Sequence, residues 1–136
     1  SNYGIEEIEA LVEATGEVPA VNQIEWSPFG WSRTMLEHCR RQDVVIQAYS
    51  PLTRTERLDD EDLRAIAAEH TKSPAQVLIR WDLQMGVVPL PKANDLGHLR
   101  ENLGVFDFEL SIEEVARLRE RNEHYSSLGA GLAYTV

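Results

Sequence analysis

Three short apolar runs alternate with helical patterns along this chain of 136 residues, and this alternation constrains its fold more than any other feature. The runs cover residues 18–23, 44–49 and 87–90, and the second is β-branched and almost wholly apolar, as in a buried parallel strand. A strand, a helix and a second strand in this order form a parallel pair with a right-handed crossover. The sequence therefore predicts a βαβαβα unit of the α/β class.

Helix signals fill the intervals between these runs. Apolar residues recur at helical spacing from residue 5, and Gly16 ends that first pattern. Ser73 and Ser111 each precede a Gln or Glu by three residues, the signature of a capping box at a helix N-terminus. The helices expected on this basis span about residues 5–15, 35–41, 59–70, 74–85, 96–103 and 111–123.

Three parallel strands alone would leave two unpaired sheet edges. A closed barrel pairs every strand, and a complete (β/α)8 barrel needs about 250 residues, so this chain would form the C-terminal half of one. The opening loop signal, Ser1-Asn2-Tyr3-Gly4, also suggests a start within a longer fold. We expect a partial (β/α)8 barrel over residues 1–136. Its barrel units and last helix would reach about residue 124, and residues 125–136 would form a C-terminal tail, flexible from residue 126.

Charge and cysteine content narrow the function. The formal net charge is −10, so nucleic acid is not an expected partner, because phosphate backbones bind clustered Lys and Arg. No apolar run approaches the length of a membrane span, and no signal peptide is apparent. The single cysteine, Cys39, excludes an internal disulfide and is interpreted as a buried small hydrophobe. These features predict a cytoplasmic protein that binds no membrane.

A basic residue follows the last predicted strand, in the run Val88-Pro89-Leu90-Pro91-Lys92-Ala93-Asn94. A cation at a strand exit beside a helix N-terminus can hold a phosphate by its charge and by backbone N–H donors. Only two lysines occur, Lys72 and Lys92, and one of them stands in this run. The alternative interpretation of Lys92 is a solvated loop residue.

Four segments occur in a fixed order and spacing: residues 1–4, 19–29, 48–52 and 91–102, with Ser73–Trp81 between the last two. Each is a weak signal alone, but together they resemble the C-terminal half of an aldo-keto reductase, up to about Asn122. The resemblance implies NAD(P)H-dependent reduction of a small aldehyde or ketone to an alcohol. It also implies the barrel fold that the strand count suggests.

The resemblance implies contacts to the nicotinamide end of the cofactor. Tyr49 would stack on the nicotinamide ring, and an aromatic face suits a flat heterocycle. Ser1, Asn2 and Gln23 would hydrogen-bond the carboxamide, which needs both a donor and an acceptor. Alternatively, Tyr49 is a core aromatic and Gln23 a satisfied polar residue at a strand end.

The resemblance also implies contacts to the phosphates and the adenine. Ser50 and Leu52 would line the path of the pyrophosphate, and Lys92 would meet the phosphate on the adenosine ribose. The further contacts implied beside Lys92 and toward the adenine are Ala93, Asn94, His98, Glu101 and Asn102.

Two departures from the family pattern bear on cofactor choice. Ala93 stands where the family usually carries Ser or Thr, so one hydroxyl donor to a phosphate is missing. His98 stands where NADP-preferring members usually carry Arg, and a neutral imidazole does not clamp a phosphate bidentately. Arg100 is turned about 200° around the helix from His98 and does not replace it. The expected cofactor is NADP, with NAD also possible.

The family's catalytic tetrad of Asp, Tyr, Lys and His comes from the first half of the barrel, and none of its motifs occurs here. No catalytic residue is therefore assigned. The leading hypothesis is an oxidoreductase fragment whose partner is the missing N-terminal half-barrel. The alternatives are a non-catalytic nucleotide-binding half-barrel, which dimerises with a second copy or regulates a partner, and a decayed gene fragment.

Several aromatic and apolar residues have a structural interpretation beside a functional one. Trp26 and Trp31 would line a substrate pocket or pack in the core, and Trp81 is interpreted as helix packing. The tail residues that would reach a substrate pocket are Tyr125, Leu128, Leu132 and Tyr134.

Overall fold

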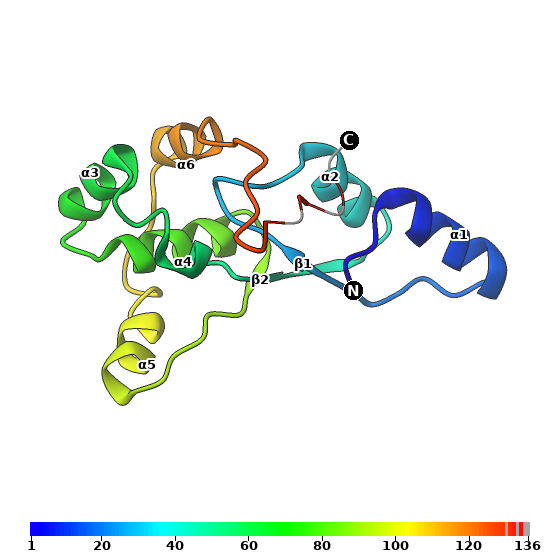
Figure 1. Cartoon of the computed structure of the whole chain (residues 1–136), viewed down its shortest axis with the longest axis horizontal. Coiled ribbons are helices and arrows are strands. Elements are labelled where there is room, and N and C mark those ends of the chain that lie inside the picture. Colours follow the sequence, from blue (N-terminus) through cyan, green and yellow to red (C-terminus); the bar gives the residue numbers. More distant parts are fainter. Residues whose placement is uncertain (130, 133, 135–136) are drawn as a thin grey trace.

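A three-stranded parallel sheet lies at the centre of the computed structural model, which describes residues 1–129, 131, 132 and 134 (Figure 1). The strands are β1 (Val21–Glu25), β2 (Val45–Tyr49) and β3 (Val88–Pro89), in the order β1-β2-β3. In the register, Glu25 lies opposite Tyr49, and Gln47 lies opposite Val88. The predicted α/β class and the three consecutive parallel strands are confirmed.

The six predicted helices all form, together with one 3₁₀ turn. Gly16 ends the first helix in the left-handed region, at φ 73°. The hydroxyls of Ser73 and Ser111 each accept a hydrogen bond from the backbone N–H three residues later, which completes both predicted capping boxes. The elements are α1 (Ile5–Thr15), α2 (Arg33–Arg41), the 3₁₀ turn η1 (Thr53–Thr55), α3 (Glu61–Glu69), α4 (Pro74–Gln84), α5 (Leu96–Leu103) and α6 (Ile112–Arg119).

Several boundaries differ from those expected by two residues or more. Helix α2 starts at Arg33 rather than at residue 35. The first strand covers Val21–Glu25 and not residues 18–23, because its pairing partner β2 sets where the ladder begins. The third helix starts at Glu61, because Asp60 is its N-cap and accepts from the Leu63 backbone N–H. The last helix ends at Arg119, three to four residues early.

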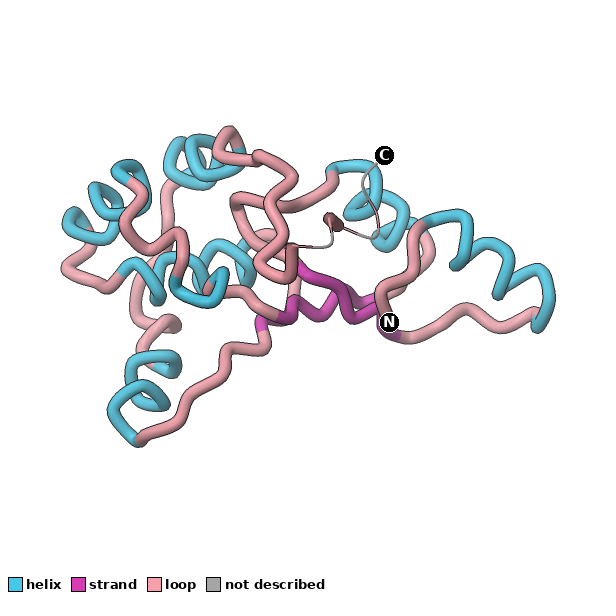
Figure 2. Tube along the Cα trace, in the orientation of Figure 1, coloured by secondary structure: helices cyan, strands magenta, loops and turns pink. Residues whose placement is uncertain are grey.

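Helices bury one face of the sheet and leave much of the other face open. Ile24, Ile46 and Ala48 are buried in the core, where α2 packs on β2 and α4 packs on β3. On the opposite face, Val21, Val45 and Val88 are 40%, 43% and 42% exposed. Figure 2 shows the strands gathered at the centre with the helices around them. A row of half-exposed valines is apolar surface that a further layer would cover.

The core confirms the structural interpretation of several side chains. Trp26, Trp31 and Trp81 are buried and form a chain of ring contacts, with centroids 6.1 and 6.2 Å apart. Cys39 is buried, and burial raises the pKa of its thiol to about 11, so the thiol stays protonated and unreactive. No helix in the described part of the chain is long and apolar enough to cross a membrane.

The C-terminal segment folds back onto the sheet, and its described residues are packed. After α6 the chain, red in Figure 1, returns toward β1, and the Phe29 carbonyl accepts hydrogen bonds from the backbone N–H groups of Glu123 and Tyr125. Leu132 and Tyr134 are buried. The flexibility expected from residue 126 is therefore wrong for the described tail residues. The prediction also covered residues 130, 133, 135 and 136, which lie outside the described residues.

Candidate functional site

The carboxyl ends of β1 and β2 meet beside a hollow of about 230 Å³, here called the Tyr49 hollow. Glu25 and Tyr49 are register partners at these two strand ends. The backbone N–H of Asn2 donates to the Gln23 carbonyl over 2.9 Å, which holds the N-terminal loop along β1. The residues that line the hollow are Asn2, Glu25, Tyr49, Leu128, Gly131, Leu132 and Tyr134. Three of the four tail residues expected at a substrate pocket are among them.

Gln23 shares a sheet face with Tyr49 but lies two residues before the end of β1. Its side-chain amide donates to the Gln47 side chain over 3.1 Å, and Gln47 is its register partner on β2. The Gln23 amide therefore already has one partner within the chain. It lies at the level below the Tyr49 hollow rather than in its lining.

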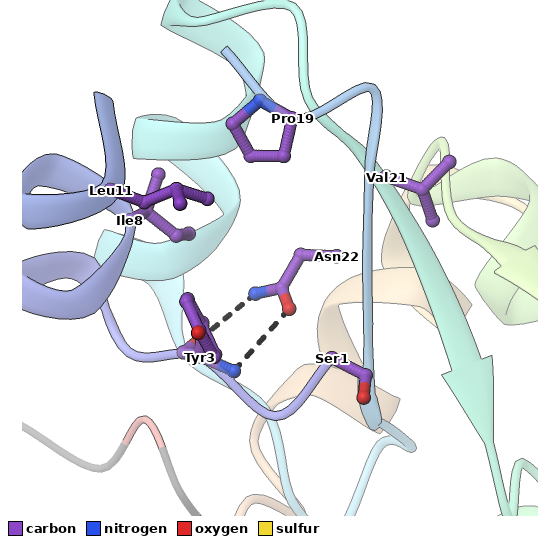
Figure 3. A pocket seen from close by; sticks show the side chains of 7 residues that line it. All are labelled: Ser1, Tyr3, Ile8, Leu11, Pro19, Val21 and Asn22. Carbon is purple, nitrogen blue, oxygen red and sulfur yellow. Dashed lines mark hydrogen bonds between the residues drawn. The ribbon is translucent and has the colours of Figure 1, made fainter. Parts of the chain in front are cut away.

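Ser1 lies in a different hollow, of about 200 Å³, between α1 and β1 (Figure 3). The Asn22 side chain fixes this place by two hydrogen bonds. Its Nδ2 donates to the Tyr3 carbonyl over 2.9 Å, and its Oδ1 accepts from the Tyr3 N–H over 3.4 Å. Ile8 and Leu11 of α1 form the apolar side. The structure thus separates Ser1 from Tyr49, although the neighbouring Asn2 reaches the Tyr49 hollow.

A second group of predicted residues surrounds Lys92. A hollow of about 500 Å³ lies between the loop after β2 and the loop after β3. Lys92 and Arg54 both line it, and within the described part of the chain neither forms an ion pair or a hydrogen bond. The complete lining is Ser50, Pro51, Leu52, Arg54, Thr55, Leu90 and Lys92. Two cations without protein partners in one concave site favour an anionic ligand.

The backbone of the loop after β2 takes an unusual path. Ser50, Thr53, Arg54 and Thr55 have φ values of 50°, 51°, 51° and 71°, in the left-handed region that residues other than Gly rarely occupy. A run of such residues costs conformational energy and is found mainly at functional loops. The turn presents the Arg54 and Thr55 side chains to the hollow that holds Lys92.

A third hollow, of about 360 Å³, adjoins the second, because Leu52, Thr55 and Lys92 line both. The two together are called the Lys92 groove below. The third hollow lies between the N-terminus of α4 and helix α5. The predicted residues in its lining are Leu52, Lys92, Asn94, His98, Glu101 and Asn102. Ala93 lines neither part of the groove.

Hydrogen bonds fix α5 against α4 and orient two of these residues. The Glu101 carboxylate accepts from the Ser73 hydroxyl, and its backbone carbonyl accepts from the Gln76 amide over 2.9 Å. The Nδ1 atom of His98 lies 2.9 Å from the Asp95 carboxylate. The backbone N–H of His98 also donates to Asp95, and this bond, with the His98 side chain, holds the pKa of that carboxyl below its usual value.

Sequence reasoning missed Arg54, Thr55 and Glu25. The stretch from residue 53 to 57 was expected only as a polar loop, although a second cation close after Ser-Pro-Leu was a usable signal. Glu25 lies within the segment 19–29 as a charged residue after an apolar run, which was a usable signal. Within the described residues, no cluster of His, Cys, Asp and Glu could hold a metal ion.

The arrangement presents an aromatic side chain at one end, hydroxyl and cationic groups in the middle, and polar groups of α5 at the other end. Tyr49 and Ser50 are consecutive, so the chain itself joins the Tyr49 hollow to the Lys92 groove. This order suits a ligand that carries a flat ring, phosphates and a second polar ring.

Comparison with known proteins gives the family. The family model described as Aldo/keto reductase family matches residues 1–123. Glyoxal reductase from Bacillus subtilis is 39% identical over 123 residues, which cover 90% of this chain and 45% of that protein. The chain spans about half the length of the curated relatives it matches.

Solved structures agree. A mutant of Gox0644 in complex with NADPH has a TM-score of 0.86 and 36% identity, over 90% of this chain and 45% of its own. An aldo-keto reductase from Bombyx mori in complex with NADP has a TM-score of 0.87 and 29% identity, over 95% of this chain and 45% of its own. The expected fold, half of a (β/α)8 barrel, is confirmed by these likenesses. On its sequence and its structure, the chain belongs to the aldo/keto reductase family.

Proposed function

We propose that this chain supplies the cofactor-binding half of an NADPH-dependent reductase that converts an aldehyde or ketone to an alcohol. The observation that carries the proposal is the path formed by the Tyr49 hollow and the Lys92 groove, which the consecutive residues Tyr49 and Ser50 link and which reaches Asn102. Nine of the twelve residues expected at the cofactor line this path. Gln23 lies two residues before the end of β1, below the Tyr49 hollow. Ser1 lines a separate hollow between α1 and β1, and Ala93 lines neither part of the Lys92 groove.

The residues along this path fit a nicotinamide dinucleotide. Tyr49 offers an aromatic ring, and Asn2 offers an amide with both donor and acceptor atoms for a carboxamide. Lys92 and Arg54 offer unpaired positive charge for phosphates. When bound, the reduced nicotinamide supplies the hydride that the carbonyl carbon receives. This chain's part is to bind and orient that group.

We propose NADP as the physiological cofactor, with Lys92 as the main contact to the ribose phosphate. His98 is already held by Asp95, and Ala93 has no hydroxyl, so fewer groups than usual recognise that phosphate. NAD would therefore bind as well, with a smaller penalty than in a reductase that carries Arg at this position.

The substrate and the rest of the barrel complete the proposal. The half-exposed face with Val21, Val45 and Val88 suits the interior of a barrel that further strands close, supplied by an N-terminal half or, alternatively, by a second copy. Leu128 and Leu132 make one wall of the Tyr49 hollow apolar, which suits a small uncharged carbonyl compound. The catalytic groups would come from the other half. A cytoplasmic setting is consistent with the single buried thiol.

Nucleotide titration and turnover together test the proposal. Tryptophan fluorescence of the chain is followed as NADPH, NADH or 2′,5′-ADP is added, and carbonyl reduction is then measured in the complete barrel. Binding with turnover supports a reductase. Binding without turnover on any aldehyde favours the alternative, a nucleotide-binding half-barrel, because every proposed cofactor contact lies in this chain. Absence of nucleotide binding by a folded protein contradicts both.

A further inference from the structure

Glu25 is a buried acid whose partners all come from the C-terminal segment. Its carboxylate accepts from the Ser126 hydroxyl over 2.6 Å, from the Ser127 backbone N–H over 2.7 Å and from the Ser127 hydroxyl. Only 6% of Glu25 is exposed, and no basic side chain in the described part of the chain pairs with it. A buried carboxylate without a cation depends on such donors, because burial without them is costly.

A second anchor holds the same segment further along. The Tyr134 hydroxyl donates to the backbone carbonyl of Glu25 and lies 3.3 Å from the Gly30 carbonyl. Its ring packs against Trp26, with centroids 5.9 Å apart. Burial, and then the nearby Glu25 carboxylate, raise the pKa of Tyr134, so the hydroxyl keeps the proton that it donates.

Gly30 leaves room for the segment to cross the loop after β1. A Cβ atom at Gly30 would lie 2.1 Å from the Tyr125 carbonyl oxygen and 3.1 Å from a methyl group of Leu132. The first contact is with backbone, which cannot rotate away. The end of β1 and the loop after it therefore accommodate the segment in three ways: the Glu25 carboxylate accepts hydrogen bonds, the Glu25 carbonyl anchors Tyr134, and Gly30 has no side chain.

Between its two anchors the segment forms one wall of the Tyr49 hollow. We call its described residues, 125–129, 131, 132 and 134, the strap. Leu128, Gly131 and Leu132 of the strap line the hollow opposite Tyr49. Gly129 and Gly131 have φ values of 70° and 72°, which let the strap turn between the anchors. The place of the strap therefore sets the shape of the hollow.

We propose that Glu25 is a positioning residue that fastens the strap across the Tyr49 hollow and disfavours negatively charged carbonyl substrates there. The fastening follows from the hydrogen bonds alone, whereas the effect on substrates rests on the proposed function. The hollow contains the Glu25 carboxylate and no Lys or Arg in its lining, so a substrate carboxylate would meet like charge. Neutral aldehydes and ketones fit the apolar strap wall.

Hydrogen exchange of the backbone amides tests the fastening without any cofactor. Glu25→Ala removes the acceptor, Glu25→Gln keeps one acceptor oxygen, and Glu37→Ala, at an exposed position of α2, is the control. We expect the Ser127 and Leu128 amides to exchange about tenfold faster in Glu25→Ala, as loss of a hydrogen bond to a charged group predicts. The exchange rates in Glu25→Gln should fall between those of Glu25→Ala and the unaltered chain, and those in Glu37→Ala should match the unaltered chain.

Two other amides separate release of the strap from general loss of structure. The Tyr125 N–H donates to Phe29, and Tyr134 is anchored on backbone, so the start of the strap stays protected when the Glu25 side chain is removed. The Val45 amide of β2, which donates to the Ala20 carbonyl over 3.0 Å, also keeps its protection. Unchanged exchange at Ser127 and Leu128 in Glu25→Ala, or a strap already unprotected in the unaltered chain, overturns the proposal.

If Glu25→Ala loses protection throughout the sheet, the double variant Ser126→Ala/Ser127→Ala decides. It removes both hydroxyl donors and leaves the carboxylate and the Ser127 N–H in place. We expect faster exchange at the backbone amide of residue 127 with an intact β2. The Leu128 amide is not used here, because it donates to the Ser126 hydroxyl that this variant removes. No change in the double variant overturns the proposal.

Substrate selection is measured in the complete barrel with benzaldehyde and 4-carboxybenzaldehyde. The unaltered enzyme should prefer benzaldehyde, and Glu25→Gln should narrow that preference by about tenfold through loss of the charge. The KM for benzaldehyde should rise in Glu25→Ala while the Kd for NADPH stays constant. Equal rises in KM and Kd, or an unchanged preference, overturn the effect on substrates. Failure of the unaltered protein to bind NADPH would refute the proposed function and leave the exchange result standing.

Discussion

The two ends of the candidate site are built in opposite ways. At the Tyr49 hollow the chain supplies its own partners, since Ser127 and Tyr134 both donate hydrogen bonds to Glu25 across about a hundred residues of sequence. At the Lys92 groove the two cations have no partner among the described residues, and α5 has no fully buried residue, with Leu96 and Leu103 each 69% exposed. The Tyr49 end has its hydrogen-bond partners before a ligand arrives, whereas the cations of the Lys92 groove have no negatively charged partner among the described residues.

The difference shows which end a ligand would stabilise. Hydrogen bonds within the protein already occupy Glu25 and Tyr134 at the Tyr49 end, so binding there depends on fit to the hollow and on charge rather than on filling empty hydrogen-bond positions. Lys92 and Arg54 line the same hollow and have no acidic partner among the described residues, so an anion would add interactions that the free protein lacks. Binding to the folded state then raises stability by mass action. The variants described below test this difference between the two ends, and the variant with the largest expected effect comes first.

Gly30→Ala should have the largest effect, a loss of stability at the Tyr49 end. The added methyl group would overlap the Tyr125 backbone carbonyl, and overpacking of this kind costs about 1–3 kcal/mol or more in the free energy of unfolding. Urea unfolding measures the loss. Gly16→Ala is the control, because a Cβ atom there meets nothing within 4 Å and costs only the backbone strain of a positive φ, about 1 kcal/mol. Equal losses in the two variants would contradict the close crossing at Gly30.

Lys92→Met should weaken nucleotide binding at the Lys92 groove without changing the fold. Loss of a charge-assisted contact to a phosphate weakens NADP binding by about 10- to 100-fold, while NAD binding changes by less than about threefold. Isothermal titration with both nucleotides measures the two constants, with Arg64→Met, at an exposed position of α3, as the control. A parallel loss for NADP and NAD would move Lys92 to the pyrophosphate.

Asp82→Asn should stabilise the folded protein at a buried position of α4. Both carboxylate oxygens of Asp82 are buried without a partner among the described residues, and burial raises the pKa of this carboxyl well above 3.8. The folded state binds this proton more tightly than the unfolded state. The unaltered chain therefore loses stability as the pH rises from 3.8 through the folded-state pKa, by about 1.4 kcal/mol for each pKa unit.

The asparagine variant lacks this titration, so its advantage should grow with pH over the same interval. Urea unfolding at acid and at neutral pH measures the difference in the free energy of unfolding. Parallel pH curves for the two proteins would show that Asp82 is paired or hydrated in the folded state.

His98→Arg should have the smallest effect, an increased preference for NADP over NAD at the Lys92 groove. A guanidinium at this position would add a partly exposed contact to the ribose phosphate, worth about two- to fivefold in the preference for NADP over NAD. Asp95 competes for the new cation, since it lies 2.9 Å from the present imidazole. The double variant Asp95→Asn/His98→Arg should therefore show a larger preference than His98→Arg alone. A lower preference in the double variant would place position 98 away from the phosphate.

The same contrast explains what the sequence predicts and what it does not. The alternation of strands and helices, both capping boxes and the place of Lys92 after a strand follow from patterns that are local in sequence. The other expected residues of the Lys92 groove come from the family resemblance, and Arg54 and Thr55 were not expected there. The start of β1 was misplaced by three residues, because pairing with Val45 on another strand decides it. The tail was expected to be flexible because it is small and polar, whereas Glu25 and Gly30 hold it from a distant loop. Such contacts leave no periodic signal.

The separation between Glu25 and the strap also has a consequence for protein synthesis. The Glu25 carboxylate and its hydroxyl donor on Ser126 lie 101 positions apart in the chain. At about 5–20 residues per second, a ribosome needs about 5–20 s to make the residues between them. During that interval the end of β1 is translated but cannot yet be covered. The wall beside Tyr49 is therefore a late product of translation, and a pause upstream of Ser126 would prolong the time during which the end of β1 lacks this wall.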